Sequence, residues 1–291
     1  MNIGVLASGG DGAGMNMFLY TLVKSLKKHN ITLFKFGYKG LIEDLVCNFG
    51  LSYLKSKCLD GGVCIKTSRC PEFTTKQGQI KALETLKKHN IDVLVVMGGN
   101  GSLKGAKSIA GKGVKIIFVP CSIDNDVSPS KYAIGFDTAC DACVKYIKNV
   151  QDTMLSFDRL CIYEVMGRDY DAIAQKVGEK VDADYIYTDK SNINDCVKYL
   201  QNTQKSAPIV ILQENLVNIE DLANDISQKL NREVKFCVIG YFQRGGTPTV
   251  NECKFAKQFA DVCVKQIKDG LTDDLIFIKY DCGSVLAMAI N

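Results

Sequence analysis

Two aspartates stand close together in the segment Pro120–Asp126, which reads Pro-Cys-Ser-Ile-Asp-Asn-Asp. The segment follows an apolar run, Val114–Val119, and this order is typical of a buried parallel strand and the loop at its carboxyl end. Open α/β sheets place their ligands at that edge. Carboxylates this close repel unless a cation or a proton lies between them, and such a pair suits proton abstraction from a hydroxyl or the binding of a metal. A plain turn is the alternative interpretation, because Asn and Asp are common turn formers.

Two glycine-rich segments share a second pattern. In Ile3–Gly14, and again in Val93–Ser102, a short apolar strand leads into glycines and then into a helical stretch. Glycine lets the backbone approach a phosphate closely, and the start of the following helix offers free N–H groups to an anion. One such loop is a weak signal, but two of them together with the paired aspartates predict a phosphoryl-transfer site.

The rest of the chain alternates strand and helix patterns, which predicts an α/β fold of doubly wound sheets with right-handed crossovers. Further strands are predicted near 31–36, 160–165, 185–188, 208–212, 236–240 and 275–278. Helices are predicted over 15–28, 77–89, 102–110, 136–150, 170–180, 192–203, 218–230 and 250–268. Two similar segments, 25–34 and 85–94, place His29 and His89 at helix carboxyl ends, as cations rather than catalysts.

Bulk composition narrows the classes of function. The chain has 291 residues, enough for one large or two ordinary domains. Its formal net charge of +4 comes with no long basic run, so no nucleic-acid partner is expected. The sequence enters a strand at once in place of a signal peptide, and no apolar run approaches the length of a membrane span. We therefore expect a cytoplasmic protein with no membrane partner.

Thirteen cysteines are many for such a chain. Disulfides are not expected in the absence of a signal peptide. Cys140 and Cys143 have the C-x-x-C spacing, but the local pattern is helical and few other ligands are near, so we expect both to face a core as small hydrophobes. Cys58, Cys64 and Cys70 are interpreted as free thiols.

Seven segments carry a resemblance to a known family, and they occur in the family's order. They are Gly-Gly-Asp-Gly-Ala-Gly-Met-Asn (9–16), Gly-Tyr-Lys-Gly-Leu (37–41), Arg-Cys-Pro-Glu-Phe (69–73), Gly-Gly-Asn-Gly-Ser (98–102), Ser-Ile-Asp-Asn-Asp (122–126), Glu-Val-Met-Gly-Arg (164–168) and Gln-Arg-Gly-Gly-Thr-Pro (243–248). Together they cover nearly the whole chain and resemble 6-phosphofructokinase of the bacterial ATP-dependent type.

This resemblance implies ATP-dependent phosphorylation of fructose 6-phosphate to fructose 1,6-bisphosphate in glycolysis, with Mg²⁺ as the cofactor. It implies a homo-oligomer, a dimer or tetramer. It also implies two doubly wound domains with the active site in the cleft between them. The first is a discontinuous ATP-binding domain, 1–134 plus 248–291, and the second is an inserted sugar-phosphate-binding domain, 135–247.

The resemblance also implies catalytic and metal-binding residues. Asp124 matches the base that takes the proton of the sugar C1 hydroxyl during attack on the γ-phosphate. Ser122 and Arg168 match residues that contact the transferring phosphate. Asn100 and Asp126 match positions near the magnesium. Phosphoryl transfer needs mainly positioning and charge neutralisation, so one carboxylate and a cationic clamp suffice.

Two sets of binding residues follow from the same resemblance. The implied nucleotide ligands are Gly9, Tyr38, Arg69, Cys70, Gly99, Asn100, Gly101 and Ser102. The implied sugar-phosphate ligands are Ser122, Ile123, Asp124, Arg159, Met166, Gly167, Arg168, Glu214, Lys235, Tyr241 and Arg244. Among them, Arg159 matches an arginine that reaches into the neighbouring subunit's sugar site. Pyrophosphate-using relatives tend to carry Asp at position 101 and Lys at position 121, so Gly101 and Cys121 disfavour pyrophosphate as the donor.

The chain departs from the family pattern at the site itself. Asn100 replaces an Asp tied to magnesium, which predicts weaker metal affinity and a slower phosphoryl step. Lys235 replaces a sugar-phosphate Arg and loses its bidentate geometry. Tyr241 replaces a His that contacts the sugar. These departures leave two alternatives open. One is a catalytically impaired protein of this fold that binds sugar phosphate or nucleotide in a regulatory role. The other is a kinase of another phosphosugar.

The effector site of the family also departs from its pattern. Tyr20, Leu51 and Gln151 occupy positions where the bacterial enzymes carry arginines, and only Lys24 and Lys205 remain basic. This predicts reduced or altered allosteric control. Members of the family also have a further terminal segment after the strand near 275–278. This sequence lacks that segment, which predicts an effect on the stability and the assembly of the protein.

Overall fold

The computed structural model describes residues 1–290, which divide into two compact units. Unit 1 comprises Met1–Ser122, Asp126–Asp137 and the chain from Gly245 onward, and unit 2 comprises Ile123–Asn125 and Thr138–Arg244. The assignment of an ATP-binding role and a sugar-binding role to two domains, 1–134 plus 248–291 and 135–247, stays a prediction. Each unit is described by itself below.

Unit 1 is built on a mixed seven-stranded sheet with the order β11-β10-β5-β4-β1-β2-β3. The strands from β10 to β2 pair in parallel, whereas β3 and β11 pair antiparallel at the two edges. The strand bounds are β1 Asn2–Ser8, β2 Asn30–Phe34, β3 Val46–Cys47, β4 Val93–Gly98, β5 Lys115–Pro120, β10 Leu275–Asp281 and β11 Ser284–Ala289. The central strands β1 and β4 are buried along nearly their whole length, as expected where helices cover both faces of a parallel sheet.

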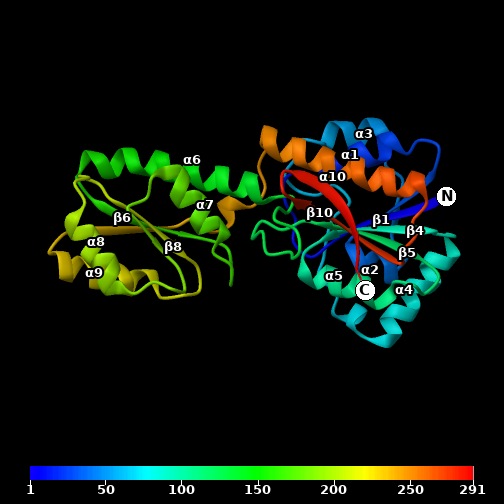
Figure 1. Cartoon of the computed structure of the whole chain (residues 1–291), viewed down its shortest axis with the longest axis horizontal. Coiled ribbons are helices and arrows are strands. Elements are labelled where there is room, and N and C mark those ends of the chain that lie inside the picture. Colours follow the sequence, from blue (N-terminus) through cyan, green and yellow to red (C-terminus); the bar gives the residue numbers. More distant parts are fainter. Residues whose placement is uncertain (291) are drawn as a thin grey trace. The chain divides into compact units, whose positions relative to one another are not determined.

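Helices cover both faces of this sheet (Figure 1). Apolar side chains of α1, α3 and α10 pack on one face, and those of α2, α4 and α5 pack on the other. The helix bounds are α1 Met15–Ser25, α2 Gly37–Ile42, α3 Leu51–Lys57, α4 Lys76–Lys88, α5 Asn100–Ile109 and α10 Val250–Asp269, with a short 3₁₀ turn, η1, at Pro71–Thr74. This two-faced burial confirms the predicted doubly wound α/β fold.

The strand order of unit 1 reverses between β1 and β4. From β1 the chain moves outward to β2 on one side, and it later returns to β4, β5 and β10 on the other side. In open α/β sheets such a topological switch point opens a crevice at the carboxyl ends of the strands, where ligands bind. Both predicted glycine loops follow these two strands directly.

Unit 2 has a parallel four-stranded sheet with the order β7-β8-β6-β9. Its strands are β6 Leu160–Val165, β7 Tyr185–Tyr187, β8 Ile209–Gln213 and β9 Val234–Val238. Its helices are α6 Phe136–Ser156, α7 Ala172–Val181, α8 Ile193–Asn202 and α9 Ile219–Leu230, followed by a 3₁₀ turn, η2, at Gly240–Gln243. Figure 1 shows α6 and α7 on one face of the sheet, and α8 and α9 pack their apolar side chains on the other.

Most predicted elements lie where the sequence placed them, with three kinds of difference. The first helix ends at Ser25, so His29 lies beyond it and its position at a helix end was wrong. His89 caps α4, as predicted, and its Nε2 contacts Asp44 at 2.6 Å. Strand β9 begins two residues earlier than predicted. The elements that the sequence analysis missed are α2, α3, β3, β11 and the two 3₁₀ turns.

The described cysteines are all free thiols, as expected, and Cys140 and Cys143 are fully buried. Within residues 1–290, no helix combines the length and apolar character needed to cross a membrane.

Candidate functional site

Three strand ends of unit 1 lie side by side at one edge of the sheet. The parallel register pairs Ser8 at the end of β1 with Gly98 at the end of β4, and Gly98 with Pro120 at the end of β5. The N–H of Cys121 donates to the Gly98 carbonyl at 2.9 Å and continues this register past the strand. The two glycine loops and the aspartate loop therefore leave the sheet next to one another, as the sequence predicted for a single site.

The loop after β1 depends on glycine for its backbone path. Gly9 has φ +88° and Gly14, which caps α1, has φ +98°, and both values lie in the left-handed region that disfavours other residues. Thr67, which the sequence analysis missed, donates from Oγ1 to the Gly9 carbonyl at 2.8 Å. The segment around Arg69 is thus tied to the glycine loop, although the Arg69 side chain itself is exposed.

The loop after β4 leads directly into α5, which begins at Asn100. The first intrahelical bonds of α5 are donated by Ser102 and Leu103 to the Gly99 carbonyl, so helix geometry leaves the N–H groups of Asn100 and Gly101 without intrahelical acceptors. Such groups, together with the helix dipole, form a natural site for an anion. A Cβ added at Gly101 would meet no atom within 4 Å, so this position is open.

The buried side chain of Ser102 links the two glycine loops by a hydrogen bond. Its buried hydroxyl donates to the Ser8 carbonyl at 2.9 Å, and its own carbonyl accepts from the Tyr38 hydroxyl at 2.7 Å. Tyr38 is 4% exposed and stacks on Phe73, and burial raises its pKa well above the ordinary range, so the hydroxyl remains a donor. Tyr38 therefore supports the start of α5 from within the core. The half-buried Cys70 packs against the same core.

The aspartate loop after β5 is held by a short hydrogen-bonded network. Ser122 Oγ donates to Asp126 Oδ1 at 2.7 Å. Asn100 Nδ2 donates both to Asp126 Oδ2 at 2.9 Å and to the Asp126 carbonyl at 3.1 Å. Because both partners are acceptors, the amide of Asn100 must present its N–H₂ group to them, which fixes its orientation. The predicted metal ligands Asn100 and Asp126 are thus in direct contact.

Asp124 lies between these two anchors in the same loop. Its side chain and that of Asp126 are partly exposed, whereas Ile123 is buried. Asn125 adopts φ +54°, a left-handed conformation that Asn tolerates better than most residues. The loop thus has the local turn chemistry that the alternative interpretation invoked, and it also presents two carboxylates at the carboxyl edge of the sheet.

Unit 2 gathers a second group of predicted residues at the carboxyl end of β6. The Glu214 carboxylate, which follows β8, accepts the N–H of Gly167 at 3.1 Å and that of Arg168 at 2.9 Å through Oε1. Gly167 and Arg168 have φ values of +144° and +51°, so these bonds stabilise an unusual backbone. Burial and, to a smaller extent, the Glu214 charge raise the pKa of Glu164 in the preceding strand.

Two residues after β9 complete this group. Gln243 is buried and accepts the Met166 N–H at 3.0 Å through Oε1. Arg244 follows it, and its guanidinium lies 5.7 Å from the ring centroid of Tyr241. The Nε atom of Arg244 is buried and has no hydrogen-bond partner among the described residues. A buried donor of this kind costs free energy unless a ligand satisfies it. Tyr241 is 81% exposed.

Arg159 and Lys235 form a separate group at the opposite end of β6. Arg159 precedes that strand, and the register pairs Lys235 with Cys161, the second residue of β6. One carboxylate, Glu233, accepts from Arg159 Nε at 2.7 Å and from Lys235 Nζ at 2.8 Å, and these two bonds lower its pKa. A strand of this length places the two groups about 20 Å apart at ~3.3 Å per residue. Within one chain, Arg159 and Arg168 therefore do not face the same ligand.

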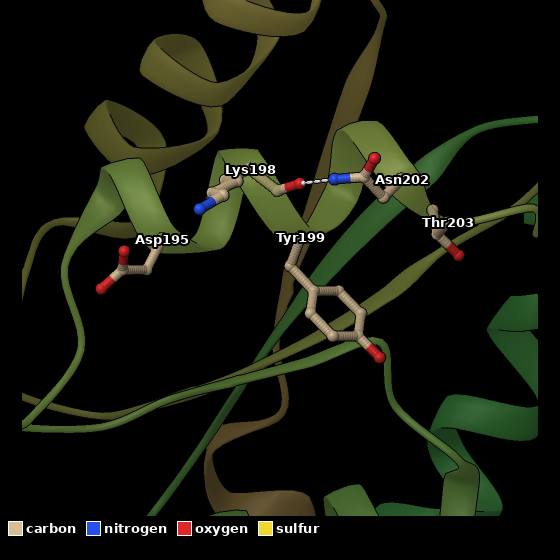
Figure 2. A pocket seen from close by; sticks show the side chains of 5 residues that line it. All are labelled: Asp195, Lys198, Tyr199, Asn202 and Thr203. Carbon is tan, nitrogen blue, oxygen red and sulfur yellow. Dashed lines mark hydrogen bonds between the residues drawn. The ribbon is translucent and has the colours of Figure 1, made fainter.

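One hollow of unit 2 contains none of the predicted site residues. Figure 2 shows it along α8, lined by Asp195, Lys198, Tyr199, Asn202 and Thr203, with a volume of about 450 Å³. The Asn202 amide donates to the Lys198 carbonyl at 2.7 Å, an ordinary contact within the helix, and Tyr199 is half exposed. The charged residues in its lining are Asp195 and Lys198, one of each sign, whereas the strand end after β5 carries two carboxylates.

Sequence reasoning missed two further polar residues that shape the site of unit 1. The buried Asn16 donates to the carbonyls of Asp60 and Gly62 at 2.9 and 2.8 Å and accepts from the Cys64 N–H at 2.8 Å. Glu252 is fully buried near the glycine loop. Asn16 closes the motif 9–16, so its place directly after the glycines was a signal. A glutamate near a helix start gives no such signal.

The fold and the loops show which structural class the chain belongs to. It is a doubly wound α/β protein with glycine loops at its topological switch point. A family model described as phosphofructokinase matches residues 2–267. The chain therefore belongs to the phosphofructokinase family, and the resemblance of its seven motifs is confirmed.

Relatives and solved structures agree with this assignment. An ATP-dependent 6-phosphofructokinase of Clostridioides difficile is 35% identical over 284 residues, which cover 95% of this chain and 89% of the relative. One of Caldanaerobacter subterraneus is 36% identical over 289 residues, with the same coverage of 95% and 89%. The crystal structure of Pichia pastoris phosphofructokinase in the T-state matches 99% of this chain with a TM-score of 0.91 and 25% identity, and the match spans 37% of that longer chain.

Proposed function

We propose that this chain is an ATP-dependent 6-phosphofructokinase, which transfers the γ-phosphoryl group of ATP to the C1 hydroxyl of fructose 6-phosphate. The single observation that carries the proposal is the register of Ser8, Gly98 and Pro120, which brings two glycine loops and the aspartate loop to one edge of the sheet. Curated relatives with that printed activity support it. The donor loops and the loop with the proposed base leave adjacent strands, which is the arrangement that in-line transfer needs.

The nucleotide side of the proposed site is formed by unit 1. The backbone around Gly9 and the N–H groups of Gly99, Asn100 and Gly101 approach the phosphates of ATP, and Arg69 adds an exposed cation. Ser102 and Tyr38 hold these loops from the core. Asp124 accepts the proton of the C1 hydroxyl as the oxygen attacks phosphorus, while the leaving oxygen stays with ADP. Ser122 contacts the transferring phosphate.

Mg²⁺ is the proposed cofactor, and the chemistry of Asn100 and Asp126 fits it. Asp126 supplies a partly exposed carboxylate, the kind of ligand that hard cations prefer. The Asn100 amide is oriented with its N–H₂ group toward Asp126, so its role is to hold that carboxylate. When bound together with nucleotide, magnesium would neutralise charge on the phosphate oxygens. Few protein ligands suffice, because magnesium in such sites takes most of its shell from phosphates and water.

Position 100 carries an amide where the family has a carboxylate, and this difference bears on how magnesium binds. Two carboxylates facing each other would need a cation between them. Here the Asn100 amide fills that place by donating a hydrogen bond, so Asp126 is held without metal. We infer that magnesium enters mainly with ATP and binds the free protein weakly. A catalytically impaired binding protein of the same fold remains the alternative that Asn100 favours.

The sugar side of the proposed site uses the group at the carboxyl end of β6. Arg168 and Arg244 are the cations for the γ-phosphate and the sugar 6-phosphate, and the orphaned Nε of Arg244 supports this role. Glu214 orients the backbone of Gly167 and Arg168 and accepts from sugar hydroxyls. Ile123 and Tyr241 complete the surroundings of the sugar. Because Tyr241 is largely exposed and stands at a family histidine, a kinase of another phosphosugar is the second candidate.

A homo-oligomer follows from the position of the other two cations. Arg159 and Lys235 lie at the far end of β6 from Arg168, so we propose that they serve the sugar site of a second copy of this chain, in a dimer or a tetramer. The Glu233 carboxylate holds both cations meanwhile. A cytoplasmic location stays a prediction.

Reduced allosteric control is also part of the proposal. Gln151 stands at a family arginine position. Its amide N–H₂ group donates to the Ala207 carbonyl at 2.6 Å, and its amide oxygen accepts from the Tyr163 hydroxyl at 2.9 Å. Lys205 bonds to Asp182 Oδ2 at 2.8 Å and lies 3.6 Å from Asp184. Gln151 lines a hollow of about 390 Å³, but its own polar atoms are satisfied internally. An anionic effector would have to displace these contacts.

The choice of ATP over pyrophosphate is supported by two positions. Gly101 is open, which leaves room for the α-phosphate and the nucleoside. Cys121 is 3% exposed within the core of unit 1, and burial raises the pKa of its thiol far above the ordinary value. A lysine at that place would have to be desolvated, which disfavours its charged form.

A coupled assay tests the proposed function. Purified protein is supplied with Mg²⁺ and fructose 6-phosphate, and ATP and pyrophosphate are offered in parallel, with the Asp124→Asn variant as the matched control. We expect product with ATP only, and with the wild-type protein only. Turnover of a different phosphosugar, in the absence of turnover of fructose 6-phosphate, would favour the second candidate. Nucleotide binding without turnover of any phosphosugar would favour the binding protein.

A further inference from the structure

Glu252 is a fully buried carboxylate to which no role has been given so far. It is the third residue of α10, and Thr249 Oγ1 caps that helix by accepting the Glu252 N–H at 3.0 Å. A glutamate at this position commonly bonds back to the N-cap N–H. In this chain its Oε1 accepts the Tyr132 hydroxyl at 2.8 Å and the Gly135 N–H at 2.9 Å. The carboxylate is therefore directed at the segment 132–135.

That segment holds the end of β5 and the start of the aspartate loop. The Ile134 N–H donates to the Pro120 carbonyl, and the Ser122 N–H donates to the Ile134 carbonyl, both at 3.0 Å. Burial and, next, the Glu252 charge raise the pKa of the Cys121 thiol, so the carboxylate is within electrostatic reach of this strand end. Glu252 thus supports the aspartate loop through one intermediate segment.

The glycine loop packs against the same carboxylate. A Cβ added at Gly14 would lie 2.9 Å from Glu252 Cγ and 3.4 Å from its Oε1. A Cβ added at Gly12 would lie 3.2 Å from Gly135 Cα and 3.3 Å from the Ile134 carbonyl. The absence of side chains at Gly12 and Gly14 is therefore needed for this contact as well as for phosphate approach. The glycine loop and the 132–135 segment meet at Glu252.

We propose that Glu252 is a positioning residue for phosphoryl transfer: it fixes the spacing between the glycine loop 9–14 and the aspartate loop 122–126. The proposal rests on the proposed function, in which the first loop binds the donor and the second carries the base. Two hydrogen bonds to Glu252 Oε1, from the Tyr132 hydroxyl and the Gly135 N–H, hold its carboxyl group in this place. Misplacement of reacting groups by ~1 Å costs about 10²-fold in rate, so a residue that touches no substrate is able to control turnover.

The test uses two conservative variants and one control. Glu252→Gln keeps the length of the side chain but replaces its carboxyl group by an amide, and Tyr132→Phe removes one of the two donors. Asp261→Asn, at an exposed position of α10, is the control. For Glu252→Gln we expect kcat to fall about 10–100-fold and the KM for ATP to rise, with the KM for fructose 6-phosphate nearly unchanged. Tyr132→Phe should show a smaller loss in the same direction.

Hydrogen exchange separates this proposal from the proposed function. In Glu252→Gln, peptides from 9–14 and from 121–135 should both exchange faster, whereas peptides from β6 in unit 2 should not change. This arm remains decisive if the wild-type protein transfers no phosphoryl group. The positioning role is overturned if kcat stays within a factor of two, if the apparent kcat falls only in proportion to lost folded protein while both KM values stay unchanged, or if only peptides from α10 exchange faster.

Discussion

The two units present their proposed ligand groups in different ways. In unit 1, the loops after β1, β4 and β5 are joined by bonds between Ser102 and Ser8, between Cys121 and Gly98, and between Asn100 and Asp126. In unit 2, the cations are partly or fully exposed, Lys235 and Arg159 share one carboxylate, and Tyr241 is 81% exposed. The nucleotide side is thus held by hydrogen bonds within unit 1, whereas on the sugar side the Nε of Arg244 has no hydrogen-bond partner among the described residues.

This difference teaches where affinity and specificity arise. A loop that is already fixed loses little conformational freedom when a ligand binds, so its contacts contribute fully to affinity. Exposed cations held by an exposed carboxylate must exchange that partner for a phosphate, and surface ion pairs of this kind contribute only about 0–1 kcal/mol. Changes to the fixed loops of the nucleotide side misplace the reacting groups and should act on turnover as well as on ATP affinity. Changes to the exposed cations of the sugar side leave those loops in place and should act mainly on the KM for fructose 6-phosphate.

The largest effect is expected for Asp124→Asn. Loss of a general base typically lowers the rate about 10²–10⁴-fold, because the C1 hydroxyl must then lose its proton to water. Fructose 6-phosphate affinity should stay within a few-fold, since positioning groups are unchanged. Steady-state kinetics and isothermal titration measure the two quantities, and retention of most of the activity would remove Asp124 from the mechanism.

A large effect is also expected for Arg244→Gln on the sugar side, but on substrate affinity where Asp124→Asn acts on the rate. One charge-assisted hydrogen bond is worth about 1.5–3 kcal/mol, so the KM for fructose 6-phosphate should rise roughly 10–150-fold. The KM for ATP should change little. Lys229→Gln, at an exposed position of α9, is the control. An equal rise in both KM values would break the comparison between the two units.

A moderate effect is expected for Asn100→Asp, which places a second carboxylate where an amide now donates to Asp126 at 2.9 Å. Without metal the two charges repel, and about 1 kcal/mol of destabilisation would lower Tm by roughly 2–4 °C for a domain of this size. Magnesium should restore Tm in the variant far more than in the wild-type protein, and the magnesium requirement for turnover should fall.

Thermal melts with and without Mg²⁺ measure this directly, with Asn149→Asp on the exposed face of α6 as the control. Equal magnesium shifts in the variant and the wild-type protein would show that position 100 does not face the metal.

The smallest effect is expected from the effectors of the family. ADP and phosphoenolpyruvate at millimolar concentration should shift half-saturation by fructose 6-phosphate less than twofold, because Gln151 and Lys205 are engaged within unit 2. An effector shifts a two-state equilibrium only by its differential binding. Saturation curves with and without each compound test this, and a several-fold shift would mean that other residues rebuild the site.

Much of the fold could be predicted from the sequence, because long apolar or amphipathic segments carry their own period. Strands β1, β4, β5 and β6 and helices α4, α8, α9 and α10 are of this kind. The short helices α2 and α3 gave no such signal, since six or seven residues hold too few turns for a period. Strand β11 follows β10 after a tight turn and was missed because its apolar residues are only half buried.

The site could be predicted in part. The places of Asp124 and Gly101 after the ends of β5 and β4 were predicted because each follows an apolar run, and their roles in catalysis and nucleotide binding stay predictions. The contacts that hold them were out of reach: Thr67 bonds to Gly9 across 58 positions, and Glu252 bonds to Gly135 across 117. Long-range hydrogen bonds depend on the tertiary fold and leave no local period. The separation of Arg159 from Arg168 likewise required the strand direction of β6.

The central claim is that the edge of unit 1 formed by β1, β4 and β5 directs phosphoryl transfer from ATP to a phosphosugar. The most direct measurement is phosphorus NMR of the purified protein with ATP, Mg²⁺ and fructose 6-phosphate. We predict that ADP and a new phosphomonoester at C1 appear in equal amounts, and that Asp124→Asn abolishes both. ATP hydrolysis to inorganic phosphate with no sugar product, or equal product formation by the variant, would contradict the account.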